Sequence, residues 1–392
     1  MVAYAALREL IPVFPVYALL FTDAGLSTSQ VSTLLVIWSA THVLLEVPSG
    51  AWADTVSRRK LLVLASALYG CCFALWSAVP TYAAFAGGFV LWGLSGSLVS
   101  GTYEAYVYDH LHARRREGSY RTVIAAGETG ALVLNLVATA AATPIVAAWG
   151  LAGAGWVSVG ICGGATLLAL WLPDDAPPSH IDPDAEPDEE QPDLSYLGML
   201  RAGLAESLHP SVARAVLLAA GVPAFLAFDE YFGLLADDLG VSLTVIPLLV
   251  ALTVAAQAVG AALAPRLPMH RLGPVVVVAG LLVAGGAVVQ RPAGFLAVAV
   301  GYGALQAAIV VAQTDLQHRI HGVARATVTS VSGLLSDVGA IALYGFVAVG
   351  SGVASMPALI TVLALLVVAL GMGAAGVYPD TWRKPTGSPG RS

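Results

Sequence analysis

The chain has 392 residues, of which 57% are hydrophobic and only 11% are charged, whereas about a quarter of the residues in soluble domains are charged. This composition excludes an ordinary water-soluble domain. The net charge of −7 reflects acidic residues crowded into positions 174–193, so it does not indicate a basic or nucleic-acid partner.

Long apolar runs follow one another along the whole chain, each close to the roughly 20 residues that a helix needs to cross a bilayer. They lack the alternation of a strand, so the fold class is an all-α membrane protein of about 12 transmembrane helices. The first run contains Arg8 and Glu9 and lacks a cleavable leader, which favours a membrane helix over a signal peptide. The predicted helices are 5–23, 30–50, 60–79, 82–108, 120–147, 151–173, 212–236, 242–265, 272–289, 293–316, 324–349 and 353–377.

The helices fall into two groups of six, separated by a segment rich in proline and acids that cannot form a core by itself. We therefore predict an N-terminal six-helix bundle over 1–173, an acidic linker over 174–211, a C-terminal bundle over 212–378 and a tail over 379–392. Leucines spaced by three and four in the second part of the linker predict a short amphipathic helix, either on the membrane surface or beneath the bundle.

Lys and Arg in short loops mark the cytoplasmic side of a membrane protein. With both termini inside, only Arg291 of the 18 basic residues lies on the far side. Arginine far outnumbers lysine, and alanine and glycine are abundant, which suggests a GC-rich bacterial genome. We expect a multi-pass protein of the bacterial inner membrane with cytoplasmic termini.

The two groups of helices echo each other, as the halves of transporters often do. The segment from Tyr17 to Ser27 shares an aromatic start and an Asp-x-Gly-apolar-Ser finish with the segment from Tyr231 to Ser242. A second echo relates 109–122 to 315–327, each of which has an Asp, then a His, then an Arg and a Thr that open a helix. Both echoes support two pseudo-symmetric bundles.

The loop after the second helix reads Gly50-Ala51-Trp52-Ala53-Asp54-Thr55-Val56-Ser57-Arg58-Arg59-Lys60. It resembles the signature loop of the major facilitator superfamily (MFS), Gly-x-x-x-Asp-Arg/Lys-x-Gly-Arg-Arg/Lys, although Thr55 and Ser57 depart from that pattern. The resemblance implies the MFS fold and a conformational lock, in which Asp54 meets the start of the eleventh helix and an Arg meets an acid ending the fourth. The implied lock residues are Gly50, Asp54, Arg58, Arg59, Asp109 and Arg325. The alternative is a positively charged loop with one helix-capping Asp.

Segments at the ends of the second, fourth and eleventh helices are similar to a bacterial branch of the superfamily that includes drug exporters and uncharacterised members. They are 46–50, 101–109 and 325–330. The glycine and proline motif that drug/proton antiporters often carry on their fifth helix is missing from 127–144. Transport is therefore better supported than antiport.

Carboxylates inside a bilayer are costly unless they are paired, protonated or face water. His42, Glu46, Glu104 and Glu128 form either a proton-accepting cluster or a static network that ties helices together. Asp337 lies alone in the middle of the eleventh helix and is the leading candidate for protonation or cation binding. The alternative is that its side chain only forms a hydrogen bond between helices. Asp229, in the outer third of the seventh helix, is a further candidate. The predicted proton-coupling residues are Asp337, Glu128, Glu46, Glu104 and Asp229.

The resemblance implies that the first, fourth, seventh and tenth helices line a central substrate path. The candidate cavity residues on them are Tyr17, Trp92, Phe225, Phe228, Tyr302 and Gln306. Their aromatic surface suits an amphipathic substrate, but aromatic residues at helical spacing also serve as packing.

Nucleotide-binding loops, zinc-protease spacing and hydrolase elbows are missing from the sequence, and its cysteines suggest neither disulfides nor a metal site. We expect a monomeric, proton-coupled secondary transporter rather than an enzyme, without cofactor or metal, exporting a small amphipathic compound by alternating access. Its partners are then a small-molecule substrate, protons and the lipid bilayer. The alternatives are a metabolite symporter and a transporter-like membrane sensor or lipid-handling protein that does not transport.

Overall fold

The computed structural model describes residues 1–174, 207–319 and 325–375, with the side chains at 47, 50, 51, 53, 54, 210, 211, 325–327 and 375 left out. These residues form helices and turns and no strand, which agrees with the predicted all-α class. The predicted linker helix, apart from its end at Leu208, and the tail over 379–392 lie outside the described residues.

The N-terminal half contains the helices up to residue 174. They are α1 (Val2–Arg8), η1 (Phe14–Val16), α2 (Tyr17–Asp23), α3 (Thr28–Thr55), α4 (Arg58–Ala78), α5 (Tyr82–Val99), α6 (Thr102–His112), η2 (Glu117–Ser119) and α7 (Tyr120–Leu170).

The C-terminal half contains the described helices after residue 207. They are α9 (Pro210–Leu226), η3 (Ala227–Tyr231), α10 (Phe232–Asp238), α11 (Ile246–Leu263), η4 (Ala264–Arg266), η5 (Met269–Arg271), α12 (Leu272–Val288), α13 (Gly294–Arg319), α14 (Arg325–Gly350) and α15 (Met356–Ala375).

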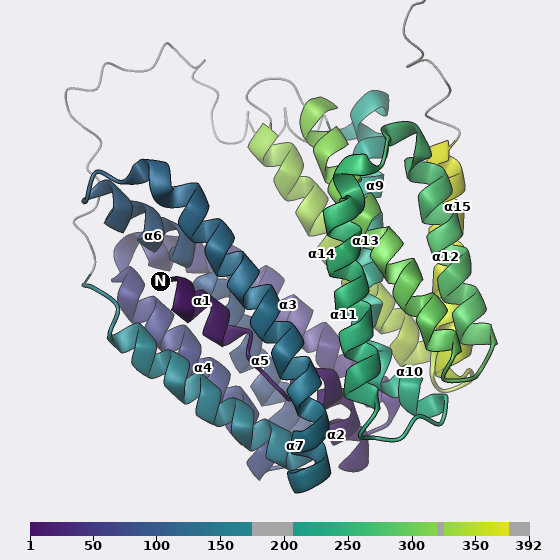
Figure 1. Ribbon diagram of the computed structural model, residues 1–392, viewed down its shortest axis with the longest axis horizontal. Helices are drawn as coiled ribbons and strands as arrows, with labels where there is room; N and C mark the ends of the chain where they lie inside the picture. The colour runs from purple at the N-terminus through teal and green to yellow at the C-terminus, as the bar shows by residue number, and fades with distance from the viewer. Residues whose placement is uncertain (175–206, 320–324, 376–392) are drawn as a thin grey trace, which may run out of the picture.

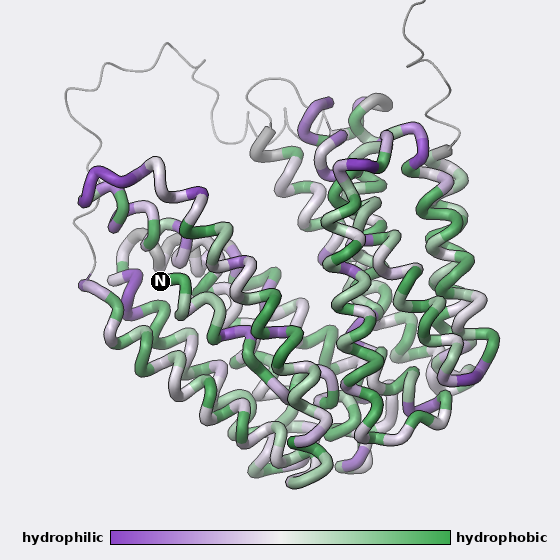
Figure 2. Tube along the Cα trace, viewed as in Figure 1, coloured by the Kyte–Doolittle hydropathy of each residue, from purple (hydrophilic) through white to green (hydrophobic). Residues whose placement is uncertain are grey.

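Ten helical stretches in the described residues are long and apolar enough to cross a bilayer. One of them, Glu117–Leu170, is 54 residues long and bends at Gly150, whose φ of 68° is a left-handed value that glycine adopts readily. It therefore crosses twice, as the predicted helices 120–147 and 151–173 require. The hydropathy of the chain follows the same pattern, with apolar spans and hydrophilic residues gathered at the ends of helices (Figure 2).

Two predicted helices are interrupted in the structure. The prediction of one continuous helix over 5–23 was wrong: α1 ends at Arg8, and helix resumes only at η1 and α2. Pro12 and Pro15 lack the backbone N–H that a continuous helix requires. The predicted helix 82–108 is likewise divided into α5 and α6 at Gly101, whose φ is 70°.

Close helix packing in the C-terminal half depends on glycine. A Cβ placed on Gly260 of α11 would lie 1.8 Å from the carbonyl oxygen of Gly303 on α13. The two helices can approach this closely only because both positions are glycine and have no Cβ. Small residues bring helices together in membranes in this way.

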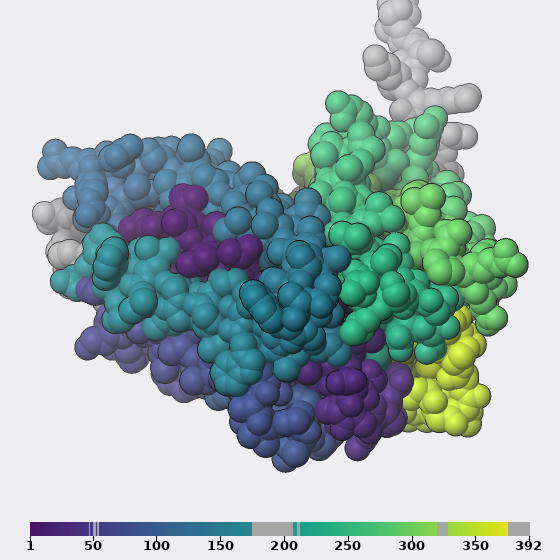
Figure 3. Space-filling model, turned by 60° about the horizontal axis from the view of Figure 1, so that its bottom comes forward, coloured from purple at the N-terminus to yellow at the C-terminus, as the bar shows by residue number. Residues whose placement is uncertain are grey.

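The two halves are in contact at one end and diverge at the other (Figure 1). Between the halves, α3 packs against α14 and α7 packs against α11. We call the end where α2 and α10 meet the gate end, and the end where residues 174 and 207 lie the linker end. Seen from the gate end, the atoms of α7 abut those of α11 (Figure 3).

Candidate transport site

The first and seventh membrane crossings are broken in the same way. The first passes through α1, η1 and α2, and the seventh passes through α9, η3 and α10. Both end in a helix of seven residues followed by a glycine with positive φ, Gly25 at 92° and Gly240 at 74°. Transporters often place their binding sites at such discontinuous helices. Here the breaks carry Glu9 in one half and Asp229 and Glu230 in the other.

A polar pocket of about 390 Å³ lies between α1, the start of α6 and α7 in the N-terminal half. We call it the acidic pocket. Its polar lining residues are Arg8, Glu9, Tyr103, Glu104, Glu128 and Asn135. Of the predicted cluster, the pocket brings together Glu104 and Glu128, with Arg8 and Glu9 beside them, whereas His42 and Glu46 are not in its lining.

Arg8 is held by neighbours of the N-terminal half. Its guanidinium donates hydrogen bonds to Tyr4 Oη and Ser95 Oγ, both at 3.3 Å, and lies 5.5 Å from the centre of the Tyr69 ring. Glu9 lies close enough for its charge to act on Arg8 and is hydrogen-bonded to Asn135. Arg8 is the one cation among the described residues that line the acidic pocket, which also holds the three carboxylates of Glu9, Glu104 and Glu128.

A second polar pocket, of about 580 Å³, occupies the equivalent place in the C-terminal half, between α9, α13 and α14. Its lining includes Asp337 together with Gln313, Gln317, Ser332 and Ser336. The helices that form it correspond, by the order of the crossings, to those that form the acidic pocket. The two halves thus present related polar surfaces.

Asp337 faces the other half of the molecule. It is exposed, and it lies close enough to His42 and Glu46 on α3 for their charges to act on it. His42 and Glu46 are 3.9 Å apart, and the Ser100 hydroxyl donates to Glu46 at 3.2 Å. The packing of α3 against α14 therefore brings a carboxylate of one half to a histidine and a carboxylate of the other.

Two side-chain hydrogen bonds join the halves near the gate end. Tyr17 Oη donates to Glu230 Oε2 at 2.5 Å, and Tyr231 Oη donates to Ser32 Oγ at 2.9 Å. Tyr17, Ser32 and Tyr231 are all buried. The start of α10 also packs tightly here, since a Cβ on Gly233 would lie 3.3 Å from the carbonyl oxygen of Pro15. Asp229 is exposed and lies beside Glu230 in η3.

The signature loop region carries an ion pair at the linker end. The guanidinium of Arg58 contacts the carboxylate of Asp109 and the backbone carbonyl of Ala105. Both charged residues belong to the N-terminal half, so this pair alone does not join the halves. Gly50 lies in α3 and Arg325 begins α14, but the side chains of Asp54 and Arg325 lie outside the described residues.

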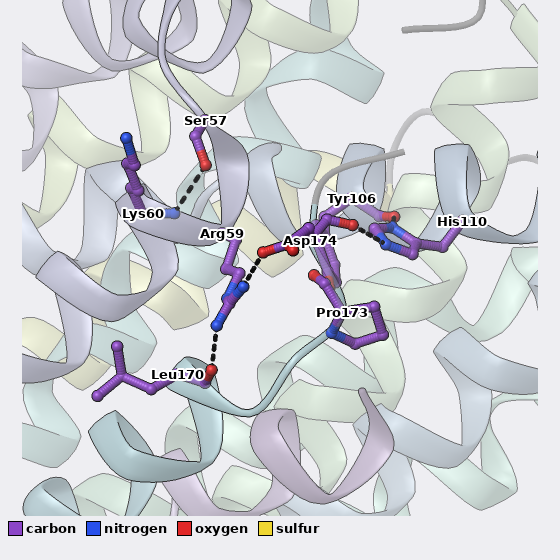
Figure 4. A network of polar contacts seen from close by, with 8 residues as sticks. All are labelled: Ser57, Arg59, Lys60, Tyr106, His110, Leu170, Pro173 and Asp174. Carbon is purple, nitrogen blue, oxygen red and sulfur yellow. Dashed lines mark hydrogen bonds and ion pairs between the residues drawn. The ribbon is translucent and has the colours of Figure 1, made fainter. Parts of the chain in front are cut away.

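Arg59 has a different partner from Arg58. Its guanidinium contacts the Asp174 carboxylate and the Leu170 carbonyl, while the ring nitrogens of His110 bond the carbonyls of Tyr106 and Asp174 (Figure 4). This network ties the last described residue before the linker to α4 and α6.

The six candidate cavity residues lie mainly in packed interior. Tyr17, Phe225, Phe228 and Tyr302 are at most 5% exposed, whereas Trp92 and Gln306 are partly buried. Trp92 stacks on Phe89 at 5.7 Å between ring centres. Phe225 borders an apolar pocket between α9, α14 and α15. Lining of a substrate path by these residues stays a prediction.

The family model described as the Major Facilitator Superfamily matches residues 1–343. The chain belongs to this superfamily. No curated protein matches the sequence significantly. The transporter is 12% identical to the nucleoside transporter NupG, with a TM-score of 0.72 over 96% of this chain and 97% of the other.

Two other solved structures are similar to the transporter. A bacterial homologue of the human lysosomal transporter Spinster, inward-facing and unoccupied, is 16% identical, with a TM-score of 0.69 over 96% of this chain and 93% of the other. The POT family transporter PepTSo is 13% identical, with a TM-score of 0.68 over 95% and 96% of the two chains. At these sequence identities the similarity shows the fold, and it does not indicate which substrate this chain transports.

Sequence reasoning missed the roles of Arg8, Asn135 and Glu230 in these sites. A signal existed for Arg8 and Glu9, because two adjacent charges inside an apolar run need an internal reason. Nothing in the sequence indicated the partner of Glu230, since Tyr17 lies 213 positions away.

Proposed function

We propose that this transporter exports a small amphipathic compound in exchange for protons, by alternating access. The observation that carries the proposal is the position of Asp337 in the C-terminal half, facing His42 and Glu46 of the N-terminal half. A charge at the boundary between two halves changes the free energy of their contact when it gains or loses a proton, and a transporter is driven by such a change.

The gate end is the natural candidate for the extracytoplasmic side. Arg58, Arg59 and the run from Arg114 to Arg116 lie at the linker end, where Arg59 contacts Asp174 and the run follows α6. Basic residues mark the cytoplasmic face. In this orientation the contacts through Tyr17 and Tyr231 close the outer side, and the divergence of the halves opens the inner side (Figure 1). The transport cycle is completed when the gate end opens and the linker end closes.

The test is proton flux in liposomes that contain the purified protein. An acid-inside gradient is imposed, and a panel of amphipathic compounds is added while internal pH is recorded. A substrate of an exchanger releases protons from the acidic lumen. We expect Asp337→Asn to abolish this release without lowering expression. The matched control is Asp237→Asn, which changes an exposed carboxylate on α10 in the same way.

Three results would count against the proposal. Proton release that persists in Asp337→Asn removes this carboxylate from coupling. Substrate movement without proton movement indicates a facilitator. Proton entry together with substrate indicates the uptake symporter instead of the exporter.

A further inference from the structure

The acidic pocket contains two carboxylates without a cation. Among the described residues, neither Glu104 nor Glu128 forms an ion pair, and the lining sets the carboxylates of Glu9, Glu104 and Glu128 against the single cation of Arg8. The pocket therefore carries an excess of negative charge inside a membrane-spanning half. Such charges are retained where they meet a partner or a substrate.

Two oxygen atoms in the same pocket also lack hydrogen bonds. Tyr103 is 7% exposed, and its Oη has no partner among the described residues; nor does the buried Oε2 of Glu104. Buried polar atoms are normally satisfied, so each exception needs an explanation. Tyr103 Oη would lie 3.3 Å from a Cβ on Gly127, and it senses the charges of Glu104 and Glu128. The unpartnered hydroxyl thus lies where α6 faces α7, beside both acids.

The remaining walls of the pocket are apolar. They come from Ala5 on α1, Val99 on α5, and Ala131 and Leu132 on α7, with the ring of Tyr4. A volume of about 390 Å³ is within the range of sites for small molecules. The pocket combines an acidic end that accepts hydrogens with an apolar body.

We propose that the acidic pocket binds an amphipathic amine, with its ammonium group held by Glu104, Glu128 and Tyr103 Oη. The inference rests on the proposed transport function and names its substrate class. A primary ammonium supplies both the positive charge and the N–H donors that the unpartnered oxygens need. A quaternary ammonium supplies only the charge, so it binds more weakly.

The test is calorimetric binding to the full-length protein in lipid nanodiscs with four probes of similar shape. These are 2-phenylethylamine, its trimethylammonium analogue, 2-phenylethanol and 3-phenylpropionate. We expect the primary amine to bind best, the quaternary analogue several-fold more weakly, and the alcohol and the acid at least about tenfold more weakly, because hydrogen bonds to charged groups are lost.

Variants assign the binding to this pocket. Glu104→Gln and Glu128→Gln are each expected to weaken binding of the amine about tenfold or more. Tyr103→Phe is expected to weaken binding of the primary amine but not of the quaternary analogue. Glu117→Gln is the matched control, because Glu117 pairs with His112 at the linker end, outside the pocket. A thermal unfolding curve establishes that each variant is folded, and either Gln variant suffices if the other does not fold.

Several outcomes would overturn the inference. They are no binding of the amine to folded protein, equal binding of alcohol and amine, and Gln variants that bind as the unmodified protein does. These differ from failure of the proposed function. Amine binding that depends on Glu128, in a protein that moves no protons, refutes proton coupling and leaves the amine site standing. Proton-coupled transport of a neutral compound, by a protein that does not bind the amine, supports the proposed function and refutes the amine site.

Discussion

Replacement of Tyr17 by Phe tests the gate end, because it deletes one hydroxyl and keeps the ring. That hydroxyl donates to Glu230 at 2.5 Å, across the boundary between the halves, and Tyr17 is 2% exposed. A hydrogen bond to a charged group contributes about 1.5–3 kcal/mol. Its loss leaves the Glu230 carboxylate without its donor in the state described here. The ring contacts of Tyr17 with Phe89 and Trp92 stay in place.

The expected result is a shift in the population of the two access states. Loss of about 1.5–3 kcal/mol from the closed gate end favours the state in which this end is open by roughly 10- to 150-fold. The halves should then approach each other at the linker end. Spin labels at Arg116 and His270, both exposed and in different halves, report this distance after the three cysteines are replaced.

The matched control is Tyr82→Phe. Tyr82 shares a hydrogen bond of 3.1 Å with Thr33, but Tyr82 is exposed and the two residues belong to the same half. We expect this variant to keep the original distance distribution. If Tyr17→Phe also keeps it, the Tyr17–Glu230 contact does not stabilise closure of the gate end, and the reasoning from its geometry is refuted.

Two further predictions concern stability. Gly260→Ala should lower the free energy of unfolding by about 1–3 kcal/mol or more, because the new Cβ meets the backbone of Gly303. Gly345→Ala is the control and should be nearly neutral, because a Cβ there meets open space. Thermal unfolding in detergent compares the two variants, and equal melting temperatures would contradict the close approach of α11 and α13. Arg58→Ala and Asp109→Ala should each lower the free energy of unfolding by about 1–3 kcal/mol, a range that allows for the partial exposure of the pair. In a double-mutant cycle the loss in the double variant should be smaller than the sum of the two single losses. Simple additivity would show that the two residues do not interact.

Much of the fold was predictable because the bilayer imposes a length on each crossing. Runs of about 20 apolar residues located the helices, and polar segments located their ends. The breaks in the first crossing were harder to predict, since Pro12 and Pro15 are tolerated within many membrane helices whose neighbours satisfy the backbone. Gly150, by contrast, separates two predicted helices and is the bend between them.

The functional site was predictable only in part. The intramembrane charges Glu104, Glu128 and Asp337 stood out because each is costly in hydrocarbon. Which of these charges lie together could not be predicted from the sequence, because the rotation and tilt of a helix are set by packing against its neighbours. The structure places Glu104 and Glu128 in one pocket with Arg8, and Asp337 in a separate pocket of the other half.

The sequence by itself therefore determined the class of the protein, its helices and its resemblance to a superfamily, since these depend on hydropathy and on residues close together in the chain. Only the tertiary structure decided that Tyr17 meets Glu230, that Ser32 meets Tyr231, and that Asp337 faces His42. Such contacts join residues about 200 or more positions apart, and their geometry depends on how two whole bundles lie against each other. No local pattern records that arrangement.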